Sequence, residues 1–432
     1  MSEPTPSPYA PPGEDEAPGQ PGGASAKTPL TTYQKKLFAF LSVATFFEGY
    51  DFIALTQVLP EVRAEMSLGK AEAGFLIAFI YVGTILAFLL VRLADRWGRR
   101  RVLTITIAGY TLTTFATGLS PEPYSFALFQ FFARIFLIAE WATTMVIAAE
   151  EYPADRRGMV LGVIQGFSAL GSIVCAGVAP FLMEHTDYGW RSVYFVGIIP
   201  LVILAIARRG LRESRRFAEQ VAGDEGKQPS LFAIWRTPYR RRLIQIALIW
   251  ALTYLCTQNA VTFWKEFVIE SRGFTAKQVG LSVSIAAVVS MPLVFYSGKL
   301  LDQIGRKLGA VVIFGLGALG VVLSYGLHGR WPLTIALVFG IFGASGVLPV
   351  LNAFTTELFP TELRGSAFAW SNNLLGRIGY VLGPAIVGLV ATDLGWGPAV
   401  QFTAIGPVVA VILILWWLPE TGSKELEETA AV

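Results

Sequence analysis

Three short motifs each occur twice in this chain of 432 residues, and the two copies of every motif are 207 residues apart. The first motif is Asp followed three residues later by Gly and two basic residues, and the second is Glu-x-x-Pro-x-x-x-Arg-Gly. The third is Glu followed by Ser or Thr. The pairs begin at Asp95 and Asp302, Glu150 and Glu357, and Glu213 and Glu420. One constant offset over three separate motifs predicts a duplicated unit, repeated without a net change of length.

The repeated unit is apolar. Hydrophobic residues make up 53% of the chain and charged residues only 15%, whereas soluble domains have about 25% charged residues. A helix that crosses a bilayer needs about 20 mostly apolar residues. The sequence predicts twelve such spans, at residues 37–60, 72–91, 102–120, 124–149, 158–183, 191–207, 243–264, 278–298, 308–327, 332–356, 366–390 and 397–418.

The distribution of Lys and Arg predicts the orientation of these spans. With a cytoplasmic N-terminus, 25 basic residues fall on the cytoplasmic side and seven on the other side, as the positive-inside rule requires. We therefore expect a multi-pass protein of the cell membrane with both termini cytoplasmic. The expected organisation is a disordered cytoplasmic tail (1–34), an N-terminal six-helix half (35–207), a cytoplasmic central loop (208–242), a C-terminal six-helix half (243–418) and a cytoplasmic tail (419–432).

The first motif resembles a loop of a known family. Between the second and third spans the chain reads Val91-Arg92-Leu93-Ala94-Asp95-Arg96-Trp97-Gly98-Arg99-Arg100. This is similar to the pattern Gly-x-Leu-Ala-Asp-Arg-x-Gly-Arg-Arg of the major facilitator superfamily, with Val91 in place of the first glycine; the second copy, from Gly298 to Lys307, keeps that glycine. The resemblance covers residues from about 35 to 428. It implies an all-α membrane protein with twelve transmembrane helices in two six-helix halves.

The resemblance also implies a role for the charged motifs. In the family they form a cytoplasmic gate that links the two halves when the cytoplasmic side is shut. The forked N–H groups of arginine pair well with carboxylates, and a carboxylate is stabilised near a helix N-terminus. The alternative interpretation is that the basic residues only anchor the loops on the cytoplasmic side. The expected gate residues are Asp95, Arg96, Arg99, Arg100, Glu150, Arg157, Asp302, Arg306, Glu357 and Arg364.

Two further segments resemble proton symporters of the superfamily. The first span contains Glu48-Gly49-Tyr50-Asp51, which is similar to a signature of aromatic acid:proton symporters. The fourth span, from Arg134 to Trp141, resembles a segment of metabolite:proton and sialate:proton symporters. We therefore expect proton-coupled uptake of a small organic anion, such as an aromatic or other carboxylate metabolite, by alternating access.

Charged residues within the spans are the candidate site. Each costs roughly 2.5–3.5 kcal/mol at a helix centre, so we expect them to face a cavity or one another. Arg134 is the candidate for the substrate carboxylate, because a guanidinium offers forked donors to a planar anion. The candidate proton carriers are Asp51, Glu48 and Glu140, and for Arg377 a structural role is expected. The other candidate substrate contacts are Tyr50, Trp141, Gln258 and Asn372. Structural ion pairs between helices are the alternative for all these charges.

Other functions stay open or are disfavoured. A proton-coupled sugar or polyol porter and a proton-driven exporter are the alternatives within transport, and a substrate sensor is another. The sequence has neither a metal-ligand cluster nor a nucleophile with a histidine in reach, which disfavours an enzyme, and it lacks a phosphate-binding glycine loop for ATP. We expect a monomer that contacts a small-molecule substrate, protons and the lipid bilayer, without a cofactor, a metal or nucleic acid.

Overall fold

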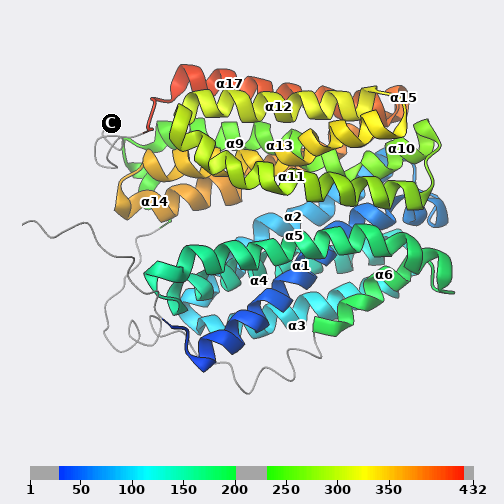
Figure 1. Cartoon of the computed structure of the whole chain (residues 1–432), viewed down its shortest axis with the longest axis horizontal. Helices are drawn as coiled ribbons and strands as arrows, with labels where there is room; N and C mark the ends of the chain where they lie inside the picture. The colour runs from blue at the N-terminus through cyan, green and yellow to red at the C-terminus, as the bar shows by residue number, and fades with distance from the viewer. Residues whose placement is uncertain (1–28, 201–230, 423–432) are drawn as a thin grey trace, which may run out of the picture.

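The computed structural model describes residues 29–200 and 231–422, except for the side chains of residues 95, 96, 154, 155 and 361. It shows two layers of long helices that run side by side (Figure 1). One layer holds the helices before residue 200 and the other holds those after residue 231. The tail at 1–28, the segment 201–230 and the last ten residues lie outside the described part. Glu213 and most of the predicted central loop lie there too.

The N-terminal layer consists of long helices with short turns. They are α1 (Thr32–Glu65), α2 (Lys70–Trp97), α3 (Arg99–Gly118), α4 (Pro123–Glu151), α5 (Ala154–His185), α6 (Arg191–Phe195) and the short 3₁₀ segment η1 (Val196–Ile198). The first helix begins before the predicted span because Thr31 and Gln34 form a capping box, in which each side chain bonds to the other residue's backbone.

The C-terminal layer repeats this plan, with more breaks. It contains η2 (Ala233–Arg236), α9 (Arg240–Thr262), α10 (Trp264–Arg272), α11 (Ala276–Ile304), α12 (Arg306–Gly326), α13 (Arg330–Glu357), α14 (Thr361–Phe368), the π-helical segment η3 (Ala369–Gly376), α15 (Ile378–Leu394), α16 (Trp396–Thr403) and α17 (Ile405–Trp417). The seventh predicted span ends at 264, but the chain continues as the separate helix α10 to Arg272.

Ten helical stretches in the described part are long and apolar enough to cross a membrane. The third predicted span corresponds to α3, which begins with three arginines and is not among the ten, although it packs against α2 and α4. The sixth begins at α6, and its residues from 201 onward lie outside the described part. The all-helical layout therefore fits the predicted architecture, and ten of the twelve expected spans meet the criteria for crossing.

The Asp-x-x-Gly motifs form tight turns at one end of the molecule, which we call the motif end. Gly98 separates α2 from α3 with φ of 96°, and Gly305 separates α11 from α12 with φ of 87°. Residues that have a Cβ atom rarely adopt these positive φ angles. The two glycines of the repeat thus have the same local cause, a sharp reversal between two membrane helices.

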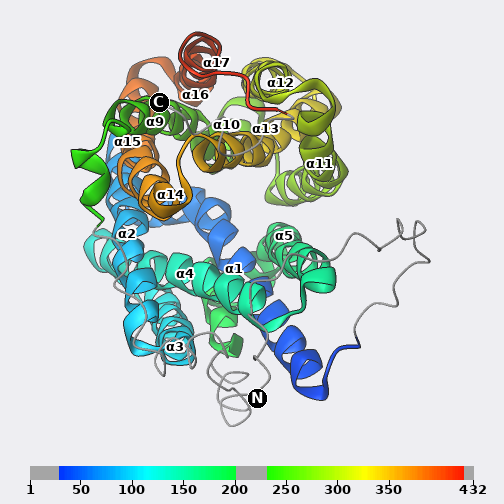
Figure 2. The ribbon, with the colours of Figure 1, turned by 90° about the vertical axis from the view of Figure 1, so that its left-hand side faces the viewer.

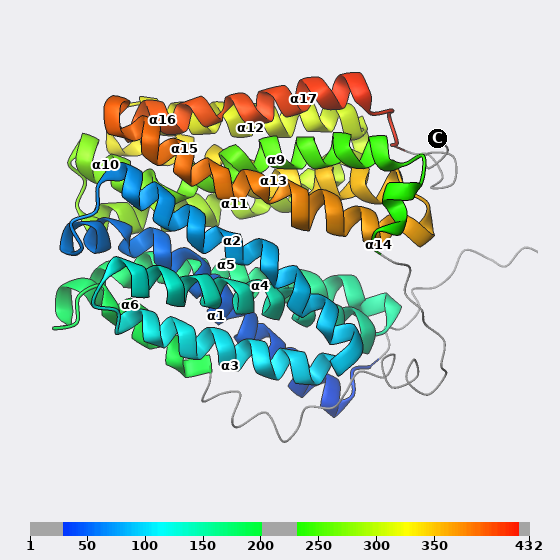
Figure 3. The same cartoon turned by 180° about the vertical axis from the view of Figure 1, so that it is seen from behind.

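The two layers touch mainly along two pairs of helices. Figure 2 looks along the helices from the motif end and shows α15 above α2 on one side and α11 above α5 on the other; Figure 3 shows α2 and α15 from the other face. Buried apolar residues of both layers form one continuous core, which includes the unpaired cysteines Cys175 and Cys256. Both cysteines therefore serve as packing residues.

Candidate functional site

Three carboxyl groups are buried within the N-terminal half. Glu48 and Asp51 lie one turn apart on α1, and Glu140 lies on α4; their residues are 5%, 7% and 0% exposed. Each carboxylate accepts a hydrogen bond from a nearby hydroxyl: Ser168 donates to Glu48 (2.7 Å), Thr114 to Asp51 (3.4 Å) and Thr144 to Glu140 (2.8 Å). One oxygen each of Asp51 and Glu140 has no partner among the described residues. The three acids and Arg134, named here the N-half polar cluster, are therefore only partly satisfied.

Arg134, on α4, is the cation of this cluster. The residue is 2% exposed, and its guanidinium lies over the rings of Phe52 (5.1 Å) and Tyr81 (5.4 Å). Its charge acts on both Glu48 and Asp51. However, it forms no direct ion pair with any described residue, and its Nη1 is buried without a partner. A buried guanidinium in this state has donors left for an anion.

The contact between the halves at this level is aromatic. Tyr81 on α2 packs edge-on against Tyr380 on α15 (5.7 Å between ring centres), and Tyr380 packs against Tyr254 on α9 (4.5 Å). We call these three residues the tyrosine trio. Gln258 donates to the Tyr81 hydroxyl (2.5 Å), and the Tyr254 hydroxyl donates to Asn372 (2.7 Å). Gln258 and Asn372, both predicted substrate contacts, thus adjoin the tyrosine trio. Tyr81 and Tyr380 were not predicted from the sequence.

The two predicted aromatic contacts lie elsewhere in the N-terminal half. The Tyr50 hydroxyl donates to the carbonyl of Val193 (3.2 Å), and its ring belongs to the apolar core. The half-buried Trp141 donates to Gln165 on α5 (3.1 Å). Gln165 is exposed although it lies inside a candidate span. The pair thus forms a polar contact between α4 and α5 inside the candidate spans.

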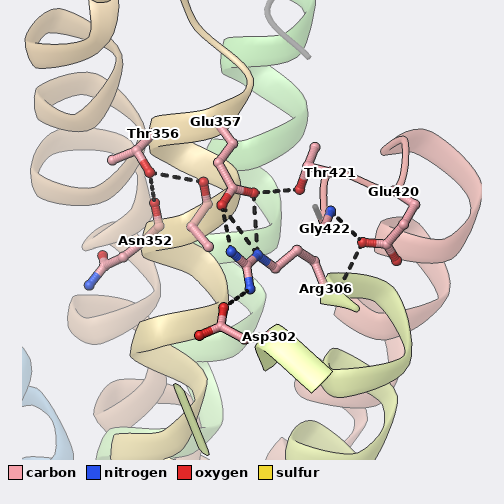
Figure 4. A network of polar contacts seen from close by, with 9 residues as sticks. Asp302, Arg306, Asn352, Thr356, Glu357, Glu420, Thr421 and Gly422 are labelled. Atoms are coloured by element: carbon pink, nitrogen blue, oxygen red, sulfur yellow. Dashed lines mark hydrogen bonds and ion pairs between the residues drawn. The ribbon is translucent and has the colours of Figure 1, made fainter. Parts of the chain in front are cut away.

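The motif end carries matching networks in the two halves. In the N-terminal half, Arg99 contacts Glu150 (3.2 Å) and the carbonyl of Ala94. In the C-terminal half, Arg306 contacts Glu357 (3.0 Å) and Asp302 (2.7 Å), as Figure 4 shows. Arg157 and Arg364 donate to the carbonyls of equivalent residues, Tyr152 and Phe359, both at 3.5 Å. Arg100 lies in the first turn of α3, and the side chains of Asp95 and Arg96 lie outside the described part.

Glu420, the third repeated motif, caps α12. Its carboxylate accepts a backbone N–H bond from Arg306 at the start of this helix (2.8 Å; Figure 4). It accepts a second one from Lys307 (2.9 Å). Thr421 donates to Glu357 (2.5 Å), which joins the cap to the Arg306 network. Burial alone would raise the pKa of Glu420, but the backbone N–H groups hold it below its usual value. The motif therefore acts as an anionic cap on a helix N-terminus.

The other end of the molecule, named here the opposite end, is joined by ion pairs between the halves. Lys265 on α10 contacts both oxygens of Glu61 on α1 (2.8 and 3.0 Å) and the carbonyl of Gln57. Arg63 on α1 pairs with Glu266 on α10 at 2.6 Å. The third pair joins Lys70 on α2 and Glu270 on α10. These opposite-end ion pairs hold α1 and α2 against α10.

The sequence indicated only the orientation of these basic residues and not their partners. The partners are separated by 203, 200 and 204 residues, none of which is the offset of 207. At that offset Arg63 corresponds to Glu270 and Lys70 to Lys277, so the repeat does not reveal the observed pairs.

The spacing between α5 and α11 changes from one end to the other. Near the opposite end, a Cβ on Gly280 would lie 2.5 Å from the carbonyl oxygen of Ala176. Gly298 lies on the same face of α11, five turns closer to the motif end, and a Cβ there would meet nothing within 4 Å. Gly162 on α5 is equally open. Helices α5 and α11 are thus in contact at the opposite end and separate toward the motif end.

The sequence matches the Major Facilitator Superfamily over residues 41–384 and, in a second overlapping match, 310–431. The chain belongs to this superfamily. It is therefore a multi-pass membrane transporter of small organic substrates and not an enzyme. The repeated motifs, the two layers of helices and the cluster of charges within the spans are all parts of one transport protein.

Curated relatives include transporters of carboxylate metabolites. The chain is 29% identical over 371 residues to the cis,cis-muconate transport protein of Acinetobacter baylyi, a match that covers 82% of this chain and 87% of the relative. It is 26% identical over 444 residues to the gallate transporter of Pseudomonas putida, covering 94% and 95%. Among solved structures, a bacterial homologue of the human lysosomal transporter Spinster, in an inward-facing and unoccupied conformation, has the same fold (TM-score 0.75, 15% identity, 90% and 97% covered).

Proposed function

We propose that this superfamily member takes up a small organic anion, such as an aromatic or other carboxylate metabolite, together with protons. It would act by alternating access as a monomer in the cell membrane, with both termini and the motif end in the cytoplasm. The curated relatives support the carboxylate, since one is named for muconate and another for gallate. The positive-inside asymmetry supports the orientation.

The observation that carries the proposal is the buried, unpaired guanidinium of Arg134. A charged group at the centre of a membrane helix is costly, and such residues pair with one another or mark a substrate pathway. Arg134 has two acids near it, Glu48 and Asp51, but no direct ion pair with either of them. Its position on α4, over the ring of Tyr81, directs it to the boundary between the halves. A substrate carboxylate there would satisfy the free donors of Arg134.

Charge balance supports protons as the coupled ion. Three carboxyl groups and one guanidinium cannot all be neutralised by pairing with one another. Bound protons are the simplest source of neutrality for the remaining acids. Asp51 is the first candidate carrier because its free oxygen is buried near Arg134, so loading of substrate and of proton can influence each other. Glu140 is the second candidate, and Glu48, held by Ser168, is the third.

The arrangement of the halves supports alternating access. The structure is held together at the opposite end by ion pairs and close helix packing, and it is separated at the motif end. We infer that the motif networks join the halves when the protein is open at the opposite end. In this view, Arg99 and Arg306 exchange contacts within their halves for contacts across the boundary.

Uptake into proteoliposomes tests the proposal, with benzoate and its hydroxylated derivatives as probes. A pH gradient that is acidic outside should drive accumulation by the wild type. Arg134→Ala should lose both accumulation and counterflow, and Arg134→Lys should recover little, because lysine lacks the planar fork. Arg330→Gln is the matched control, since Arg330 lies at the opposite end beside Trp331 and outside the cluster.

Asp51→Asn separates coupling from substrate binding. A neutral amide resembles the protonated acid, so the loaded carrier should still exchange substrate in counterflow while accumulation is lost. Full accumulation by Asp51→Asn would move the proton to Glu140. Full counterflow of a neutral sugar by Arg134→Ala, with no response to any carboxylate in the wild type, would instead establish the sugar or polyol porter.

A further inference from the structure

The two halves each place one arginine within their membrane-spanning helices, and the structure gives neither of them an acidic partner. Arg134 comes from α4 and Arg377 follows η3, just before α15. Neither side chain makes a hydrogen bond or ion pair to any residue in the ranges 29–200 and 231–422, and buried nitrogens of both (Nη1 of Arg134 and Nε of Arg377) have no partner. The proposed function uses Arg134 alone, so Arg377 is a second unexplained cation.

Both arginines lie deep between the halves. Arg134 precedes the motif-end terminus of α4, Glu151, by 17 residues, and Arg377 follows the motif-end terminus of α14, Thr361, by 16 residues, eight of which form η3. The aromatic rings that lie beneath the two guanidinium groups contact each other, so the two cations lie near one level. A molecule that enters between the halves from the motif end would therefore meet both guanidinium groups.

Aromatic rings connect the two cations. The guanidinium of Arg134 lies 5.4 Å from the centre of the Tyr81 ring, and that of Arg377 lies 5.8 Å from the centre of the Tyr380 ring. The two rings belong to the tyrosine trio and are 5.7 Å apart across the boundary between the halves. The sequence of groups is therefore cation, ring, ring, cation, with one cation and one ring from each half.

The backbone at Arg377 has a local irregularity that sets its position. Its N–H donates to the carbonyl of Asn372 (3.2 Å), five residues earlier, as in a π-helix. Such segments are rare and frequently mark functional sites. The side chain of Asn372 also accepts the hydrogen bond of Tyr254. The π-helical turn thus fixes Arg377 and the tyrosine trio relative to each other.

We propose that Arg377 is a second anion anchor and that the substrate is a dicarboxylate with a flat, unsaturated body. One carboxylate binds Arg134, the other binds Arg377, and the body lies against Tyr81 and Tyr380. This rests on the proposed function, because it takes Arg134 as the first anchor. A monocarboxylate bound to Arg134 would leave Arg377, in the other half, without an anionic partner among the described residues, and an unpaired charge within membrane helices is costly. A dianion that bridges the halves satisfies both.

Ligand-induced thermal stabilisation of the purified full-length chain tests this, since a bound ligand raises apparent stability by mass action. The probes are the three benzenedicarboxylate isomers and straight-chain diacids of different length, each beside its monomethyl ester, with benzoate as the reference monoanion. For at least one pair, the diacid should bind at least about tenfold more tightly than its ester, the factor expected for one extra charged hydrogen bond.

The variants separate binding from structure. Arg377→Gln should abolish the preference for the diacid while benzoate and the esters bind as before; Arg377→Lys should keep part of the preference. Arg134→Gln should weaken all probes, and Arg330→Gln should change none. Equal weakening of diacid and ester by Arg377→Gln, or no preference in the wild type for any pair, would overturn the second anchor and leave the proposed function intact. If no carboxylate of either kind stabilises the wild type, the proposed function fails and this inference fails with it.

Discussion

Replacement of Lys265 by methionine should open the protein at the opposite end. The ammonium group of Lys265 belongs to the C-terminal half, and all its described partners, Glu61 and the carbonyl of Gln57, belong to the N-terminal half. The Lys265 side chain is 2% exposed and that of Glu61 is 31% exposed. Methionine retains most of the buried volume and removes the charge. The interaction that is lost therefore exists only when the halves meet at this end.

The magnitude follows from burial and geometry. A hydrogen bond to a charged group contributes about 1.5–3 kcal/mol, and desolvation of the buried ammonium offsets part of this. We expect a net loss of about 1–2 kcal/mol for the closed state, and since about 1.4 kcal/mol corresponds to a factor of ten, the open population should rise roughly tenfold.

The assay measures the reaction of a cysteine at the α5–α11 contact. Ser284 lies on α11 and donates to the carbonyl of Ile173 on α5 (3.4 Å), so Ser284→Cys should react with an impermeant maleimide from the opposite side only when this end opens. Cys175→Ala and Cys256→Ala remove the native thiols. In this background Lys265→Met should raise the labelling rate about tenfold.

Glu65→Gln is the matched control for this experiment. Glu65 pairs with Arg191 (2.6 Å) at the same end, but both residues belong to the N-terminal half, so the labelling rate should stay unchanged. If Lys265→Met folds normally and labels at the wild-type rate, the ion pair does not hold this end closed. Faster labelling in Glu65→Gln as well would show a general loosening of the helix ends in place of a specific release.

Three further predictions concern neighbouring parts of the two ends. Burial raises the pKa of Glu266 to about 7 although Arg63 opposes the shift, so the closed state binds the Glu266 proton more tightly than a solvated Glu266 does, an advantage that is complete below about pH 4.5 and is lost as pH rises through 7. The reactive thiolate of Ser284→Cys itself becomes more abundant as pH rises, so the opposite-side labelling rate is compared at each pH with that of the Ser284→Cys, Glu266→Gln protein. The ratio of the first rate to the second should rise over this range, and a ratio that stays constant would contradict the prediction. Glu420→Gln weakens the anionic cap of α12, whose depressed pKa reflects backbone N–H bonds, and should lower stability by about 0.5–2 kcal/mol, measured by thermal unfolding; an unchanged midpoint would contradict the capping role. Gly280→Val places a Cβ 2.5 Å from the carbonyl oxygen of Ala176 on α5 and should destabilise the closed state by about 1–3 kcal/mol. The effect should appear as faster opposite-side labelling of Ser284→Cys. Gly298→Val, at a position with nothing within 4 Å of its Cβ, should leave the labelling rate unchanged.

The sequence by itself determined the helical class, the duplication and the identity of the charged positions. Membrane spans can be predicted from the sequence because an α-helical segment that crosses the bilayer must be long and apolar. The repeat can be recognised because the motif-end turns need glycine at a positive φ and charged neighbours at fixed spacing. Arg99 with Glu150 and Arg306 with Asp302 and Glu357 accordingly contact one another within their halves. Their role as a gate stays a prediction.

Only the tertiary structure decided which residues of the two halves meet. The partnership of Lys265 with Glu61, and of Tyr81 with Tyr380, depends on how α1 and α2 lie against α10 and α15. No local pattern encodes this, because the partners are far apart in the chain and each residue looks like an ordinary charged or aromatic position of its own helix. The same holds for Arg377, which the sequence marked only as a costly charge. Its place at the depth of Arg134 follows from a π-helical turn and from packing between the halves, and these are properties of the folded protein.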